Sequence, residues 1–208
     1  MDNNQTDIKP SEVERFNDYY IQKFKNKPYP IFSNIEFNLH GSCNRRCAFC
    51  PRVDESLWPN LDEELSIDLF DKIISELKTI NYSGRISFSG FSEPFLHSKL
   101  IELIKKITLN LPDAKSEIIT NGDYLKEDNL KELFEEGLQY IYVSLYTNKR
   151  TFDYLNSLKN NLKKEYQTKF NIRPRNLGRK NKFGLNLNNR AGAVDYTRFG
   201  MKQEKILP

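Results

Sequence analysis

The sequence predicts an α/β fold whose strands form a parallel sheet. Short apolar runs typical of buried strands alternate along the chain with longer segments whose apolar residues recur at helical spacing. Polar motifs rich in Cys, Gly or Asn follow three of the strand-like runs. Strands that alternate with helices form parallel sheets with right-handed crossovers, and ligands bind beyond the carboxyl ends of such strands. The predicted strands are 35–39, 85–90, 117–120, 140–146 and 169–173.

The N-terminal part of the chain, residues 1–33, is predicted to be a helical extension. Ser11 and Glu14 have the spacing of a capping box, and Lys27-Pro28 ends the helical pattern that follows. We therefore expect an amphipathic helix over 11–25. Its apolar face consists of Val13, Phe16, Tyr20 and Phe24.

Four further helices are expected between the predicted strands, within a core domain of residues 34–176. Ser66 is a suitable N-cap for the first of them. The second spans 98–108, and the third spans 126–136 and ends at Gly137, which takes the C-cap position. The first helix has the apolar residues Ile67, Phe70, Ile73, Ile74 and Leu77, and the fourth has Phe152, Leu155, Leu158 and Leu162.

The last segment, residues 177–208, differs in composition from the core. It is rich in Asn, Lys and Arg and has little apolar periodicity. Only 183–187 has the pattern of a further short strand. We expect a basic, irregular segment here.

Length and composition limit the class of protein. The chain has 208 residues, of which 38% are hydrophobic, which is enough for one core and little for a second. Its 32 basic and 28 acidic side chains give a net charge of +4, so a nucleic-acid partner is not expected. No stretch approaches the roughly 20 apolar residues of a membrane span, and the N-terminus does not have the pattern of a signal peptide. We expect a cytoplasmic protein without membrane contacts.

All three cysteines lie in one loop after the first predicted strand. Cys43, Cys47 and Cys50 have the spacing Cys-x3-Cys-x2-Cys. Three thiolates on a cubane of four irons leave one iron without a protein ligand, which is what a catalytic metal site needs. The alternative is a structural zinc site in which His40 is the fourth ligand of a Cys3His set.

Three motifs together resemble the radical S-adenosylmethionine (radical SAM) superfamily. The first is the cysteine loop, in which Phe49 fills the aromatic position before the last cysteine. The second is Ile86 to Pro94, similar to the Gly-Gly-Glu-Pro motif of the second strand, although Phe91-Ser92 replaces the second glycine. The third is Thr120-Asn121-Gly122 after the third strand. The resemblance implies a partial (β/α) barrel, half to three quarters of a TIM barrel.

The resemblance also implies the cofactors and the chemistry. The three cysteines would hold a [4Fe-4S] cluster whose fourth iron binds S-adenosylmethionine. One electron then gives methionine and a 5′-deoxyadenosyl radical, which abstracts hydrogen from a substrate. The superfamily draws this electron from a donor such as a flavodoxin or ferredoxin. The second interpretation is a non-catalytic module that holds zinc or a cluster and acts through a partner.

Several residues are candidates for binding the cofactor or substrate. The resemblance assigns Glu93 to the ammonium group of S-adenosylmethionine and Phe49 to its adenine. Gly90 allows the backbone to approach a ligand, and Pro94 fixes the turn. The candidates for ribose, carboxylate or phosphate oxygens are Asn121, Ser144 and Arg173.

The C-terminal segment contains a further resemblance. Asn189-Arg190-Ala191-Gly192 is similar to a segment that precedes the SPASM or twitch domain in some radical SAM enzymes, but no cysteine follows Cys50. We therefore expect 177–208 to be the truncated link to such a domain, and a further domain or partner chain to complete the barrel. The resemblance of this segment favours a small molecule or a peptide as substrate.

Overall fold

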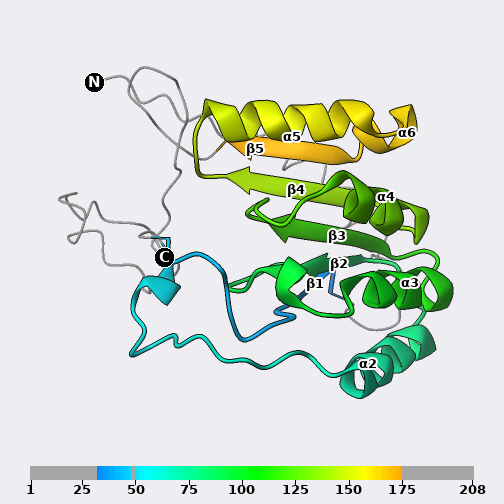
Figure 1. Ribbon diagram of the computed structural model, residues 1–208. Coiled ribbons are helices and arrows are strands. Elements are labelled where there is room, and N and C mark those ends of the chain that lie inside the picture. Colours follow the sequence, from blue (N-terminus) through cyan, green and yellow to red (C-terminus); the bar gives the residue numbers. More distant parts are fainter. Residues whose placement is uncertain (1–31, 48–49, 175–208) are drawn as a thin grey trace, which may run out of the picture.

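The computed structural model describes residues 32–47 and 50–174. The helix predicted over 11–25, the aromatic Phe49 and the segment 177–208 lie outside them. The described chain forms one sheet of five parallel strands in the order β1-β2-β3-β4-β5 (Figure 1). The strands are β1 (Asn34–Phe37), β2 (Arg85–Phe88), β3 (Lys115–Thr120), β4 (Tyr140–Leu145) and β5 (Phe170–Pro174). The predicted α/β fold with a parallel sheet is therefore confirmed.

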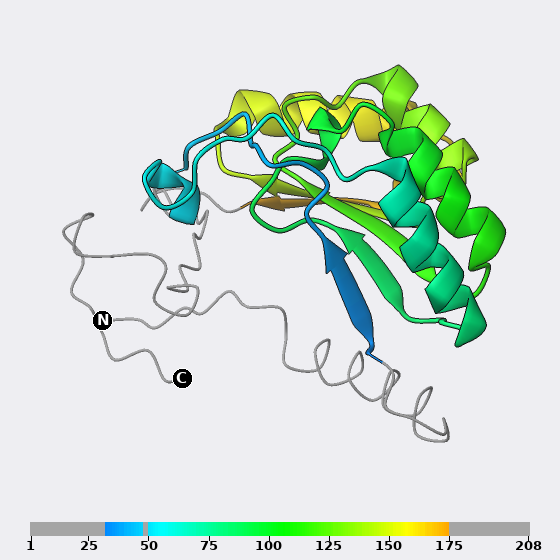
Figure 2. The same cartoon turned by 90° about the horizontal axis from the view of Figure 1, so that it is seen from below.

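Four helices cover one face of the curved sheet (Figure 2). Ser66 caps the first of them as predicted, because its side chain accepts a hydrogen bond of 3.2 Å from the backbone N–H of Leu69. Gly137 ends the third, with a positive φ of 103° that disfavours any residue with a Cβ atom. The helices are α2 (Ile67–Thr79), α3 (Leu100–Asn110), α4 (Glu127–Glu135) and α5 (Lys149–Asn161).

The alternating faces of the strands separate an apolar layer from a polar one. One row of paired, buried residues crosses the whole sheet and packs in the hydrophobic core: Phe37, Phe88, Ile118, Ile141 and Phe170. On the first three strands, the row one residue before this apolar row is polar. These side chains lie on the opposite face, because successive residues of a strand alternate between faces.

The polar row is held together by its own contacts. It comprises Glu36, Ser87 and Glu117, which are paired across β1, β2 and β3. Ser87 Oγ donates to Glu117 Oε1 over 2.5 Å, and Arg85 lies 3.2 Å from the same carboxylate. The carboxylate of Glu117 is therefore buried but paired, as a buried charge must be.

The structure contains short elements that the sequence did not predict. They are the 3-10 helices η1 (Pro51–Val53) and η2 (Pro94–Leu96), the single turn α6 (Lys164–Gln167) and an antiparallel bridge between His40 and Glu64. Each is too short to show a period in the sequence. The predicted strand and helix bounds differ from the observed ones by up to two residues.

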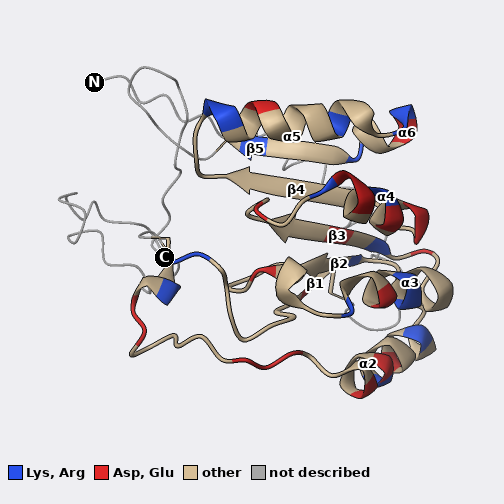
Figure 3. Ribbon diagram, in the orientation of Figure 1, with Lys and Arg blue, Asp and Glu red and all other residues tan. Residues whose placement is uncertain are grey.

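Basic and acidic side chains both occur on the described helices, and acidic ones predominate on α4 (Figure 3). None of the helices within 32–47 and 50–174 has the length and hydrophobicity needed to cross a bilayer.

Candidate active site

The three motifs meet at the edge of the sheet where its strands end (Figure 1). The chain leaves β1 into the cysteine loop, leaves β2 into the segment 89–96 and leaves β3 into the segment 121–126. The backbone joins the first two segments directly, since the N–H of Glu93 donates to Ser42 O over 3.2 Å. Parallel strands deliver their carboxyl ends to one edge, and this is where such sheets bind ligands.

The cysteine loop is compact and partly buried. The N–H of Cys50 donates to Cys47 O over 2.9 Å, and all three cysteines are half-buried with free thiols. Burial raises the pKa of the Cys47 thiol to about 11 and also raises the pKa of Cys43. In the metal-free protein both thiols therefore keep their protons at neutral pH, and a metal has to displace them.

Glu93 joins the end of β2 to the end of β3. Its side chain is 1% exposed; Oε1 accepts from Thr120 Oγ1 over 2.6 Å and from the Phe95 N–H over 3.3 Å. Its Oε2 accepts from the backbone N–H of Asn121 over 2.9 Å. Burial raises the pKa of this carboxyl and outweighs these hydrogen bonds, which lower it. Because a carboxylate oxygen has two acceptor positions, Oε2 can accept one more donor.

Asn121 extends this connection to the cysteines. Its Nδ2 donates to Asn44 Oδ1 over 2.7 Å and lies 3.9 Å from Cys43 Sγ. Its Oδ1 accepts from the N–H of Asp123 over 2.9 Å. The structure therefore places Asn121 against the cysteine loop, where its amide contacts the sulfur of Cys43.

An ion pair fixes the middle of the same loop. Arg45 donates through Nε to Asp123 Oδ2 over 2.6 Å and through Nη2 to Oδ1, so the pair is bidentate. Asn44 Nδ2 donates to the same carboxylate over 2.8 Å. The hydrogen bonds and charge of Arg45 hold the pKa of Asp123 below its usual range. Together Asp123 and Asn121 tie the cysteine loop to the end of β3.

The ring nitrogens of His40 contact groups other than the cysteines. Its Nδ1 accepts a hydrogen bond of 3.0 Å from the N–H of Ser42, and its Nε2 lies 3.9 Å from Asp62. Both ring nitrogens therefore face groups other than the cysteine sulfurs. Within 32–47 and 50–174, no three His, Cys, Asp or Glu side chains converge as ligands of one metal ion. A cubane needs no such convergence, because each thiolate binds a different iron.

The segment after β2 approaches the site closely. Gly90 has a φ of 94°, and a Cβ atom there would lie 2.4 Å from Asn38 Oδ1. Two residues later, Ser92 Oγ is buried and has no hydrogen-bond partner among the described residues. A buried hydroxyl without a partner is rare in proteins, so it indicates a polar group that a ligand would supply. Pro94 begins η2, which turns the chain away from the edge.

Ser144 and Arg173 lie on β4 and β5, at the other end of the strand order from β1, which leads into the cysteine loop. They are paired in register on β4 and β5, and Ser144 is buried. The guanidinium carbon of Arg173 lies 3.8 Å from the ring centroid of Tyr142. The structure thus brings these two residues together on β4 and β5, whereas Glu93 follows β2.

The residues present fit an iron-sulfur cluster and S-adenosylmethionine. Three half-buried thiols on one loop provide the soft ligands that iron-sulfur clusters take. The unpartnered Ser92 Oγ and the remaining acceptor position of Glu93 lie in the segment after β2, beside this loop. The site therefore provides an acceptor and a hydroxyl for a polar organic ligand next to the three thiols.

Four residues of the site were missed by sequence reasoning. Asp123, Arg45 and Ser92 are ordinary polar residues in the sequence, and their partners lie on other loops. Arg52 follows the last cysteine by two residues and is buried, with an exposure of 6%. Its position directly after Cys50-Pro51 is the one signal that would have pointed to it.

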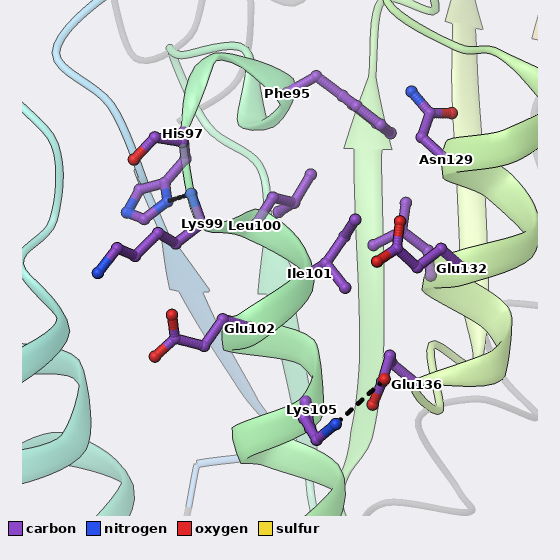
Figure 4. A pocket seen from close by; sticks show the side chains of 12 residues that line it. Phe95, His97, Lys99, Leu100, Ile101, Glu102, Lys105, Asn129, Glu132 and Glu136 are labelled. Atoms are coloured by element: carbon purple, nitrogen blue, oxygen red, sulfur yellow. Dashed lines mark hydrogen bonds and ion pairs between the residues drawn. The ribbon is translucent and has the colours of Figure 1, made fainter.

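A separate groove on the outer surface begins at Phe95 of η2 (Figure 4). It runs between α3 and α4, and Lys105 pairs with Glu136 across it over 3.2 Å. His97 lines one end, where Nδ1 accepts from the N–H of Lys99 and Nε2 contacts Leu65 O over 2.9 Å. Both ring nitrogens of His97 are thus engaged with the backbone, in a structural role.

Comparison with known proteins points to the same part of the chain. The family model for the radical SAM superfamily matches residues 37–170. The S-adenosyl-L-methionine-dependent 2-deoxy-scyllo-inosamine dehydrogenase of Niallia circulans is 33% identical over 114 residues, which are 55% of this chain and 45% of that protein. The GTP 3',8-cyclase of Clostridium perfringens strain 13 is 29% identical over 113 residues, which are 54% of this chain and 34% of that protein. The matched part of the chain spans less than half the length of these curated relatives.

Two solved structures share the architecture. The crystal structure of BtrN in complex with AdoMet and 2-DOIA has a TM-score of 0.66 at 28% sequence identity, covering 80% of this chain and 63% of that one. BtrN in an open conformation has a TM-score of 0.55 at 27% identity, covering 69% and 56%. The likeness confirms the predicted partial (β/α) barrel.

Proposed function

The chain belongs to the radical SAM superfamily, and from that premise we propose that it binds a [4Fe-4S] cluster and S-adenosylmethionine and generates a 5′-deoxyadenosyl radical. An iron-sulfur cluster and S-adenosylmethionine are inherent to the superfamily. We propose that the cluster is of the [4Fe-4S] type, that S-adenosylmethionine is cleaved at it, and that the resulting radical abstracts hydrogen from a substrate. When bound, the reduced cluster supplies the electron that splits S-adenosylmethionine into methionine and the radical.

In this proposal, one set of residues holds the cluster and another set holds S-adenosylmethionine. Cys43, Cys47 and Cys50 would each hold one iron of a cubane, which would leave one iron without a protein ligand and open to the cofactor. The free acceptor position of Glu93 Oε2 takes an N–H of the ammonium group, a charge-assisted contact. Ser92 Oγ gains the hydrogen-bond partner that the described residues do not provide.

The single observation that carries the proposal is the chain of contacts from Glu93 to the cysteine loop. Glu93 holds the backbone of Asn121, and the amide of Asn121 contacts Asn44 and the sulfur of Cys43. A structural zinc loop has no need of a buried carboxylate on a neighbouring strand. A cofactor that bridges the metal and the second strand does need one, since it must be held at both ends.

The substrate and partners are proposed at the level of class. The names of the two relatives give 2-deoxy-scyllo-inosamine and GTP as the compounds on which they act. We propose a polar small molecule or a peptide as substrate, with Ser144 and Arg173 on β4 and β5 available for its oxygens or acidic groups. A flavodoxin or ferredoxin would supply the electron, and a further domain or chain would complete the barrel.

The test is anaerobic reconstitution with iron and sulfide, followed by EPR of the dithionite-reduced protein with and without S-adenosylmethionine. We expect about four irons per chain, a signal that changes when the cofactor is added, and 5′-deoxyadenosine in the quenched reaction. The matched control replaces Cys43, Cys47 and Cys50 with Ala and should take up no cluster. Stoichiometric zinc without iron uptake would contradict the proposal, and a cluster indifferent to the cofactor would indicate a non-catalytic module.

A further inference from the structure

Arg52 connects three segments of the site through its guanidinium group. Nη2 donates to Gly41 O over 2.9 Å, at the start of the cysteine loop. Nη1 donates to Pro59 O over 3.2 Å and to Asn60 Oδ1 over 3.0 Å, in the segment that returns from the loop. Nε donates to Phe91 O, next to Ser92. The side chain is 6% exposed and its orientation is therefore fixed from all sides.

Each of these acceptors is a neutral carbonyl oxygen. The two other arginines of the loop differ, since Arg45 pairs with Asp123 and Arg46 pairs with Glu55. Among the residues that the structure describes, no carboxylate forms an ion pair with Arg52. A buried charge without a counter-charge is strongly unfavourable, so a negative group is needed near Arg52 in the working protein.

The thiolates of the cysteine loop are candidates for this negative group. Arg52 follows Cys50 by two residues in η1, and it shares an acceptor with Cys43: Asn60 Oδ1 also accepts from the Cys43 N–H over 3.3 Å. The guanidinium is therefore held at the cysteine loop through the same Asn60 side chain that binds the backbone of Cys43.

We propose that the buried charge of Arg52 is the counter-charge of the thiolate-bound cluster and raises its reduction potential. This inference rests on the proposed function, because it needs the cluster to be present. Reduction by one electron adds a negative charge to the cluster, and a fixed positive charge nearby stabilises the reduced form more than the oxidised form. Arg52 is thus a positioning residue that acts on the cluster from outside its ligand set.

The test compares Arg52→Gln and Arg52→Lys with the wild type. Each protein is reconstituted anaerobically, its iron is counted, and its potential is measured by EPR-monitored redox titration without S-adenosylmethionine. We expect a more negative potential for Arg52→Gln and a potential near the wild-type value for Arg52→Lys, which retains the charge. The matched control is Arg46→Gln, which removes an exposed, paired charge from the same loop and should leave the potential unchanged.

The possible outcomes separate this inference from the proposed function. A wild type that takes up no iron would overturn both. Equal reduction potentials for the wild type and Arg52→Gln, at equal iron content, would overturn the role of Arg52 alone. If Arg52→Gln also lost the response of its EPR signal to S-adenosylmethionine at that unchanged potential, the charge of Arg52 would act on the cofactor and not on the cluster. If Arg52→Gln does not load, Arg52→Lys decides: loading at the wild-type potential supports the role of the charge, and failure to load overturns it.

Discussion

Glu93, in the segment after β2, accepts a hydrogen bond of 2.6 Å from the hydroxyl of Thr120, the last residue of β3. The contact is buried, and the N–H of the next residue, Asn121, donates to the other oxygen of the same carboxylate. One side chain therefore closes the gap between two adjacent strand ends. The residue that we propose for the ammonium group of the cofactor therefore also joins the ends of β2 and β3.

Glu93→Ala is expected to lower the free energy of unfolding by about 2 kcal/mol, because it leaves the Thr120 hydroxyl and the Asn121 N–H buried without a partner. Urea denaturation of the metal-free protein measures this. Glu132→Ala, at an exposed position on α4, serves as the control and should change stability by less than about 0.5 kcal/mol. Equal effects of the two substitutions would show that the Glu93 contacts contribute nothing to the fold.

Two carboxyl groups of the site are expected to affect stability with opposite dependence on pH. The pKa of Asp123 is lowered, so its contribution is present above its ordinary value of 3.8 and is lost as the pH falls through the lowered pKa. The pKa of Glu93 is raised, so its contribution is present below 4.5 and is lost as the pH rises through the raised pKa.

The measurement is the unfolding free energy of the metal-free wild type, Asp123→Asn and Glu93→Gln between about pH 3 and pH 8. The penalty of Asp123→Asn should grow with pH, and the penalty of Glu93→Gln should shrink. A penalty of Glu93→Gln that grows with pH would mean that hydrogen bonding, and not burial, dominates at Glu93.

Asp123→Ala is expected to loosen the cysteine loop. It removes the bidentate pair with Arg45 and the hydrogen bond from Asn44, with a loss of about 1 kcal/mol in stability because the carboxylate is partly exposed. Chelator-driven iron release from the reconstituted protein should be faster than in the wild type. Glu55→Ala breaks the exposed pair with Arg46 on the same loop and should leave the release rate unchanged. Similar release from both variants would exclude a specific role for Asp123.

Sequence patterns predicted the sheet and the place of the site. All five strands and the four helices between them occur where the apolar periodicity indicated, and the three motifs meet at one edge because parallel strands end there. The local signals were sufficient since each strand alternates with one helix along the chain.

The contacts within the site could not be predicted in the same way. Arg45 and Asp123 are 78 residues apart, and nothing in either neighbourhood marks the other as a partner. His40 was a possible zinc ligand by spacing, but its ring turns toward the N–H of Ser42. The burial of Arg52 among carbonyls depends on how three loops pack, which no periodicity records.

Gly90→Ala is expected to lower the free energy of unfolding by about 1 to 3 kcal/mol. The backbone there has a φ of 94°, and a Cβ atom would lie 2.4 Å from the side-chain oxygen of Asn38, which accepts a hydrogen bond of 2.8 Å from the N–H of Phe91. Relief of the clash would break this hydrogen bond and shift the segment that leads to Glu93.

Thermal unfolding of the metal-free protein and binding of S-adenosylmethionine to the reconstituted protein would both be measured for Gly90→Ala. The control is Ser92→Ala in the same segment, which removes a hydroxyl without a described partner and should not destabilise the metal-free protein. Both variants should bind the cofactor more weakly, Gly90→Ala through the backbone and Ser92→Ala through the lost hydroxyl. A Gly90→Ala protein as stable as the wild type would show that the segment can take another path, and the need for glycine at this position would then be refuted.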